Sequence, residues 1–448
     1  MMANEDSSST RPELDRPDSL KPFASMWSGQ AFSLFGSRLV RFVIVWWLTL
    51  ETGSATVLAI ASIAAIAPQI IITPFAGSLV DRWDRRRVMI TADSLTAVLT
   101  GSLALLFYLD SFVLTGIVEV WHMYAVILLG SVLGSFHWPA MQASTTMLVP
   151  EEQLSRVGGM NQALNGLANV LAPPVAAVLF AFLPMHQLLL VDVITAVIAV
   201  SSLAFIRIPT PPRETMEEDS TPIRDMVEGF RFLRGWPGAL LILALAMILN
   251  LVSTPAFSLV PILSTVHFGG DELTLALLQS ASSLGMVLGG ILLTVWGGPK
   301  RKMRLALMAL VVEGIGSIFI GLTPPDFLYF AVGMLFMIGL MIPIFNGLIF
   351  ALLQTAIPAD MQGRVFALIV SGASAMSPIG LAVAGPFADA FGVPLWFLIS
   401  GIVTAVLSAA VMFVPATQNL EARANERMNS KDRSAPESES KAQFAALE

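Results

Sequence analysis

A few charged side chains interrupt long apolar stretches of this 448-residue chain, and they are the groups best suited to chemistry. Arg38 and Arg41 are three residues apart, so both guanidinium groups fall on one face of a helix. An ionisable group near the centre of a bilayer is costly and usually faces a polar interior. We expect the two arginines either to bind an acidic group of a substrate or to form structural ion pairs with Asp93 or Asp192.

Three acids and one histidine lie in similar apolar surroundings. A carboxylic acid buried without a partner readily holds a proton near neutral pH, so Glu313, Asp192 and Asp93 are candidates for proton coupling. Glu313 is the best of them on chemical grounds, because it stands alone at the middle of its segment. Imidazole titrates near physiological pH, so His137 is either a proton carrier or a packed polar residue.

Other chemistries lack their residues. The chain has no cysteine, which excludes thiolate metal sites and thiol nucleophiles. Its four histidines are far apart in sequence, and it has neither a phosphate-binding Gly-Lys-Ser/Thr loop nor a catalytic serine elbow. Its basic residues are spread over many loops, which is not the footprint of nucleic-acid binding. We expect no enzyme, no metal and no cofactor.

The elements that position these groups are membrane helices. Hydrophobic residues make up 55% of the chain, charged residues only 13%, and the mean hydropathy is +0.75. A helix crosses the hydrocarbon core with about 20 apolar residues. The sequence predicts twelve such spans, over 24–50, 56–80, 88–108, 121–147, 157–183, 187–206, 238–262, 273–296, 304–322, 327–355, 364–388 and 394–414.

The basic residues predict the orientation of these spans. All Lys and Arg residues except Arg38 and Arg41, 23 of 25, fall in the two tails or in every second connection. In the remaining connections all the charged residues are acidic, among them Asp110, Asp271 and Asp389. Because basic loops stay on the cytoplasmic side, we expect a multi-pass protein of the cell membrane with both termini in the cytoplasm.

The spans divide into two similar halves. Pro150 to Val157 follows the fourth span and Pro358 to Val365 follows the tenth, and both segments read Pro, five residues, Arg, Val. Ile223 to Leu233 has the apolar spacing of an amphipathic helix. The sequence thus predicts an all-α protein divided into an N-tail, a six-helix bundle, a linker, a second six-helix bundle and a C-tail, over 1–22, 23–206, 207–236, 237–414 and 415–448.

The connection after the second span contains a recognisable motif, which runs from Gly77 through Asp81 to Arg87 as GSLVDRWDRRR. It resembles the cytoplasmic loop signature of the major facilitator superfamily. The resemblance implies that Gly77 permits close helix packing and that acidic and basic residues latch the two halves when the cytoplasmic side is closed. The gate residues it implies are Gly77, Asp81, Arg82, Arg85 and Arg86.

Further features resemble the subgroup of macrolide and enterobactin exporters, which are drug–proton antiporters. Asp84 stands where the family motif usually has its second Gly, and Phe32 to Gly36 reads FSLFG. In the fifth span, Gly166 to Pro174 is similar to a degenerate antiporter signature, although its two prolines are also explained by a simple kink.

In the family's fold, spans 1, 4, 7 and 10 line a central cavity and spans 3, 6, 9 and 12 support them. The resemblance therefore implies a cavity wall with no carboxylate, which disfavours cationic substrates. It implies a wall that contains Gln30, Arg38, Arg41, His137, Gln142, Asn250 and Asn346.

We expect a monomeric secondary transporter that exports an amphipathic drug or metabolite in exchange for protons, by rocking of the two halves. Transport of an anionic lipid or siderophore-like compound, with Arg38 and Arg41 binding its acidic group, is one alternative. A membrane sensor or scaffold that transports nothing is the other.

Overall fold

The computed structural model describes residues 20–80, 82–206, 208, 230–231, 233–299 and 301–416. Outside these residues lie Asp81, most of the two tails, and nearly all of the expected linker with its amphipathic helix. Within them, twelve helices are long and apolar enough to cross a membrane, which confirms the predicted all-α membrane fold.

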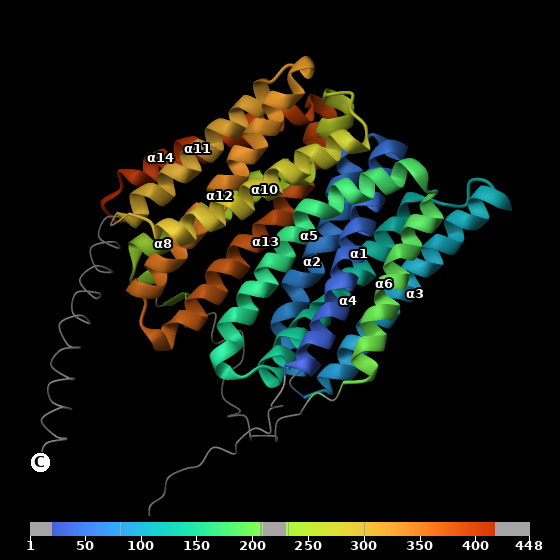
Figure 1. Ribbon diagram of the computed structural model, residues 1–448. Helices are drawn as coiled ribbons and strands as arrows, with labels where there is room; N and C mark the ends of the chain where they lie inside the picture. Colours follow the sequence, from blue (N-terminus) through green and yellow to red (C-terminus); the bar gives the residue numbers. More distant parts are fainter. Residues whose placement is uncertain are drawn as a thin grey trace, which may run out of the picture.

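The first half consists of α1 to α6, blue to green in Figure 1. Their bounds are α1 Lys21–Thr52, α2 Ala55–Val80, α3 Arg85–Phe112, α4 Val120–Leu148, α5 Leu154–Phe182 and α6 Met185–Ala204. A short 3₁₀ turn, η1 Glu151–Gln153, leads into α5.

The second half begins with α8, which is continued by a short helical turn and a π-helical turn, and it ends with α14, red in Figure 1. Its elements are α8 Pro237–Ser258, α9 Val260–Ile262, η2 Leu263–His267, α10 Glu272–Trp296, α11 Lys302–Leu322, η3 Pro325–Phe327, α12 Leu328–Ala356, α13 Ala359–Phe391 and α14 Val393–Met412.

The repeated Pro-x5-Arg-Val segments form similar turns. In the first half the backbone N–H of Gln153 donates to the carbonyl of Pro150 before α5, and in the second the N–H of Met361 donates to that of Pro358. Pro358 is the N-cap residue of α13. Its φ of −55° and ψ of 142° lie outside the helical conformation, as is usual for an N-cap residue.

Helix contacts define how the halves are built and where they meet. Within the first half α1 packs against α5 and α6, and α3 against α4 and α6; within the second α10 packs against α12, and α11 against α12 and α14. The halves meet along two long pairs, α2 with α13 and α5 with α10.

The hydrophobic cores show that the halves are joined at one end only. We call the end with the basic connections the basic end and the other the acidic end. Near the acidic end one continuous core contains residues of both halves, such as Trp46 and Phe397. Near the basic end each half has its own core, around Met89 in the first half and Leu307 in the second.

At the acidic end a single carboxylate bridges the halves. Asp389 of α13 accepts hydrogen bonds from the backbone N–H groups of Ala55 and Thr56, at 2.6 and 3.0 Å, and from the hydroxyls of Ser54 and Thr56. The first N–H groups of a helix have no partner within the helix and carry partial positive charge, so a carboxylate is a favourable cap. Asp389 thus fastens α13 to the start of α2.

Candidate substrate cavity

A cavity of about 790 Å³ lies mainly against the first half. Helices α1 to α6 contribute almost all of its lining, while the second half contributes Phe257, Ser258, Pro261 and Gln279. A smaller cavity of about 310 Å³ lies between α1, α5 and the second half. Arg38 and Arg41 line both cavities and therefore stand between them.

Arg38 is held by amides rather than by an acid. Its Nη2 donates to Oδ1 of Asn165 at 3.1 Å, and its Nη1 donates to Oδ1 of Asn169. Asn161, one turn earlier on α5, accepts a hydrogen bond of 2.8 Å from the indole N–H of Trp27 on α1. The expected ion pair for Arg38 is not present among the described residues.

These three asparagines were not among the residues predicted from the sequence. They recur every four residues along α5, so they share one face of the helix, and that spacing is the signal that could have identified them. Asn169 lies inside the degenerate antiporter signature.

Arg41 is accessible and has no hydrogen-bond or ion-pair partner among the described residues. Asp192 on α6 lines the same cavity as Arg41. Asp192 itself accepts hydrogen bonds from Ser37 at 2.7 Å and from Thr100 at 2.8 Å. The guanidinium of Arg41 is therefore left available to a ligand.

Asp93 on α3 joins two of the predicted cavity residues. Gln30 Nε2 donates to its Oδ2 at 2.9 Å, and Nε2 of His137 lies 3.3 Å from its Oδ1, close enough for an ion pair but not aligned as a hydrogen bond. All three side chains line the large cavity.

The expectation that no carboxylate lines the cavity is wrong, because Asp93 and Asp192 both do. They belong to the supporting helices α3 and α6, but α1 has small residues where it faces them. Gly29 and Gly36 pack against Ser202 and Thr195 of α6, so α1 lies close enough for the acids to reach its polar side chains. Cationic substrates are therefore no longer disfavoured.

Four predicted residues lie elsewhere. Gln142, Asn250 and Asn346 line neither cavity, and Asn250 instead accepts a hydrogen bond of 3.4 Å from Ser377 of α13. Glu313 is buried in α11, also lines neither cavity and has no hydrogen-bond or ion-pair partner within the described ranges. The predicted residues that do line a cavity all belong to the first half.

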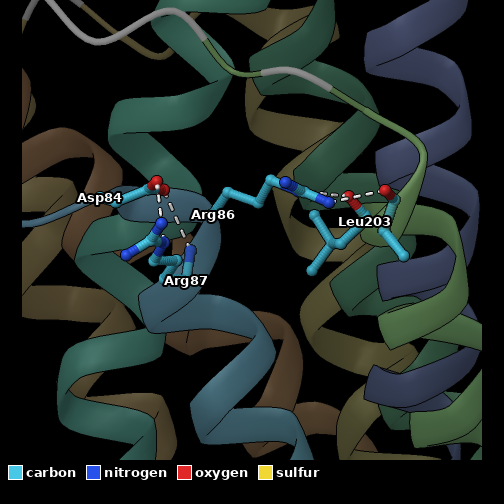
Figure 2. A network of polar contacts seen from close by, with 5 residues as sticks. Asp84, Arg86, Arg87 and Leu203 are labelled. Atoms are coloured by element: carbon cyan, nitrogen blue, oxygen red, sulfur yellow. Dashed lines mark hydrogen bonds and ion pairs between the residues drawn. The ribbon is translucent and has the colours of Figure 1, made fainter.

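The loop motif forms contacts within the first half, as Figure 2 shows. Arg86 donates to the carbonyls of Leu203 and Ala204, at 2.7 and 2.6 Å, and so caps the end of α6. Asp84 accepts a hydrogen bond of 3.1 Å from the backbone N–H of Arg87 as the N-cap of α3, and lies 3.5 Å from its guanidinium. This role accounts for Asp84 at the position of the family's second Gly.

The close helix packing expected at Gly77 is not present. A Cβ atom added to Gly77 would have nothing within 4 Å, Arg82 is exposed and Arg85 is buried. This agrees with halves that are separate at the basic end, where the implied latch would be open.

Comparisons with known proteins identify the class to which this fold and cavity belong. The sequence profile of the Major Facilitator Superfamily matches residues 26–381 and 257–442. The chain belongs to this superfamily, and it is therefore a multi-pass membrane transporter of small molecules rather than an enzyme.

Individual relatives are more specific. The chain is 34% identical to "Macrolide efflux protein A" of Streptococcus pyogenes over 391 residues, which are 87% of this chain and 94% of that protein. It is 27% identical to "Multidrug efflux pump Tap" of Mycolicibacterium fortuitum over 416 residues, which are 89% of this chain and 96% of the pump.

Solved structures agree in fold alone. A mutant form of the nucleoside transporter NupG aligns with a TM-score of 0.65 at 15% identity over 88% of this chain and all of that chain. A bacterial homologue of the iron transporter ferroportin, in an inward-facing state, aligns with a TM-score of 0.63 at 17% identity over 89% of this chain and all of that chain.

Proposed function

We propose that this chain exports an amphipathic small molecule, such as a macrolide or another drug or metabolite, across the cell membrane in exchange for protons. The observation that carries the proposal is the cavity of about 790 Å³, whose lining combines polar side chains such as Gln30 and Gln279 with apolar ones such as Ile44 and Phe257. Such a site suits a ligand with one polar and one apolar face. Full-length similarity to macrolide and multidrug efflux proteins supports the same substrate class.

The direction of transport rests on the basic residues. With both termini in the cytoplasm, the separate cores of the basic end leave the cavity accessible from the cytoplasm, where an exporter takes up its substrate. Closing that end and opening the acidic end would release the substrate outside. The change requires the loop motif, Asp81 included, to engage the second half and the Asp389 bridge to break. We take the transporting unit to be a monomer, since one chain encloses the whole cavity.

The experiment is a susceptibility test in a bacterial host without its own macrolide pumps. Wild-type expression should raise the inhibitory concentration of macrolides several-fold. Gly134→Trp should abolish the gain, because Gly134 lines the cavity and its surroundings have room for the ring. Gly333→Trp, at an exposed position of α12 outside both cavities, is the matched control and should retain it. Equal resistance from wild type and Gly134→Trp would contradict the proposal.

A second candidate, transport of an acidic amphipath, is favoured by Arg41, which has no partner within the described ranges. A hydrogen bond to a charged group contributes about 1.5–3 kcal/mol, which corresponds to roughly 10- to 150-fold in affinity. Arg41→Gln should therefore weaken binding of an acidic substrate at least tenfold, Arg41→Lys should retain most of it, and a neutral macrolide should bind both alike. Equal binding of the acidic compound to wild type and Arg41→Gln would exclude this candidate.

A further inference from the structure

The large cavity contains one carboxylate and one imidazole at ion-pair distance. Asp93 comes from α3 and His137 from α4, and their nearest side-chain atoms, Oδ1 and Nε2, are 3.3 Å apart. The other oxygen of Asp93 accepts the hydrogen bond from Gln30 of α1. The pair therefore connects three helices of the cavity wall.

The charged groups around the pair differ from helix to helix. Among the lining residues, α4 contributes no charged group besides His137, and α6 contributes Asp192. Helix α1 contributes Gln30 beside the pair and, further along, Arg38 and Arg41. The pair thus shares the cavity lining with one further acid and two arginines.

The three acids predicted as candidates for proton coupling differ in their hydrogen bonds and in their position relative to the cavity. Both oxygens of Asp192 already accept hydrogen bonds, one from the hydroxyl of Ser37 and one from that of Thr100. Glu313 is buried away from both cavities, so a proton on it has no contact with the substrate site. Oδ1 of Asp93 faces a titratable ring on the cavity wall itself.

We propose that Asp93 and His137 together carry the exchanged proton, an inference that rests on the proposed proton-coupled export. In the protonated state the proton lies on Nε2 of His137 and pairs with the Asp93 carboxylate. When substrate occupies the polar wall, the Nε2–H bond breaks, its electron pair stays on the nitrogen, and the proton leaves with a water of the cavity. Gln30 is a positioning residue that fixes the carboxylate for this exchange.

The experiment separates coupling from binding in proteoliposomes that contain erythromycin as the probe. A pH difference of one unit should drive roughly tenfold accumulation by the wild type in one-for-one exchange with protons. Asp93→Asn and His137→Gln should lose this accumulation but should still exchange labelled for unlabelled erythromycin at equal pH, which requires no net proton movement. Asp326→Asn, which neutralises an exposed acid outside both cavities, should behave as the wild type.

The outcomes distinguish this inference from the proposed function. Suppose that the wild type and both variants accumulate the probe, or that Glu313→Gln is the variant that loses accumulation. The assignment of the proton to Asp93 and His137 is then wrong, but proton-coupled export is retained. If the wild type exchanges the probe but ignores the pH difference, both proton coupling and this site are wrong. If Asp93→Asn loses exchange as well as accumulation, the result for His137→Gln tests the proposal. Accumulation driven by the pH difference in His137→Gln would overturn the proposal, whereas exchange without accumulation in that variant would support it.

Discussion

The two halves of the protein use their helices differently, although they share one architecture. In the first half, side chains connect the helices: Arg38 to Asn165 and Asn169, Asp192 to Ser37. In the second half, α10 packs on α12 with backbone against backbone, and a Cβ added to Gly285 would overlap the carbonyl oxygen of Phe336. The first half therefore offers polar groups to its cavity, whereas α10 and α12 of the second half form a tightly packed apolar pair.

The largest expected effect tests the close packing of the second half. Gly285→Ala should destabilise the protein by about 2–3 kcal/mol, because the added methyl group overlaps backbone that cannot move independently. Gly290→Ala on the same helix is the control, since a Cβ there has nothing within 4 Å and alanine favours helix by up to about 1 kcal/mol. Thermal unfolding of the purified protein measures both, and equal stability would remove the contrast between the halves.

The next effect tests the polar contacts of the first half. Asn165→Leu should cost about 1.5 kcal/mol, because the guanidinium of half-buried Arg38 loses an acceptor. The same substitution in the second half, Asn346→Leu, should change stability by less than about 0.5 kcal/mol, since Asn346 is exposed. Chemical denaturation in a mild detergent compares the two. A larger loss for Asn346→Leu would reverse the proposed division between the halves.

A third prediction concerns the joint between the halves. Asp389→Ala removes the carboxylate that caps α2 and should weaken the closed acidic end by about 1 kcal/mol, which shifts the conformational equilibrium roughly fivefold. Because the chain has no cysteine, a single Gly134→Cys reports on this shift without background. Labelling of that cysteine by an impermeant maleimide from the acidic end should become faster. The exposed acid at the same end, changed in Asp326→Asn, should leave the rate unaltered.

The last expected effect is similar in size to that of Asp389→Ala and depends on pH. Hydrogen bonds from the backbone N–H and the hydroxyl of Thr274 lower the pKa of Asp271, the N-cap residue of α10. Because its pKa is lower in the folded state, Asp271 stabilises the protein above its unfolded pKa of about 4, and this stabilisation is lost as the pH falls through the folded value. Asp271→Ala should cost about 1 kcal/mol at neutral pH.

The same substitution should matter less as the pH falls below about 4, whereas Asp271→Asn retains a cap that does not titrate. Melting curves over this pH range measure the change. A destabilisation by Asp271→Ala that is equally large at every pH would contradict the assigned role.

Much of the fold was predictable because the bilayer imposes strong constraints on a sequence. Each predicted span agrees with an observed helix to within a few residues, since a crossing segment must be long, apolar and helical. The Pro150 and Pro358 segments likewise begin corresponding helices. These features depend on residues close together in the chain.

The site was predictable only in part. Sequence reasoning selected Gln30, Arg38, Arg41 and His137, which line the cavity, because polar groups within apolar spans are conspicuous. It also selected Asn250 and Asn346, which do not, because membership of a span does not specify which way a helix face turns. The asparagines of α5 were missed since neutral amides cost less in a membrane than charges and attract less notice.

The sequence by itself determined the number of membrane helices, their division into two halves and the segregation of basic from acidic connections. These follow from composition and local spacing. Only the tertiary structure decided that Asp93 meets His137, that Asp192 meets Ser37 and that Arg41 stays without a partner among the described residues. Such pairings depend on how each helix rotates about its axis and how closely its neighbours approach, and packing across the whole bundle sets both.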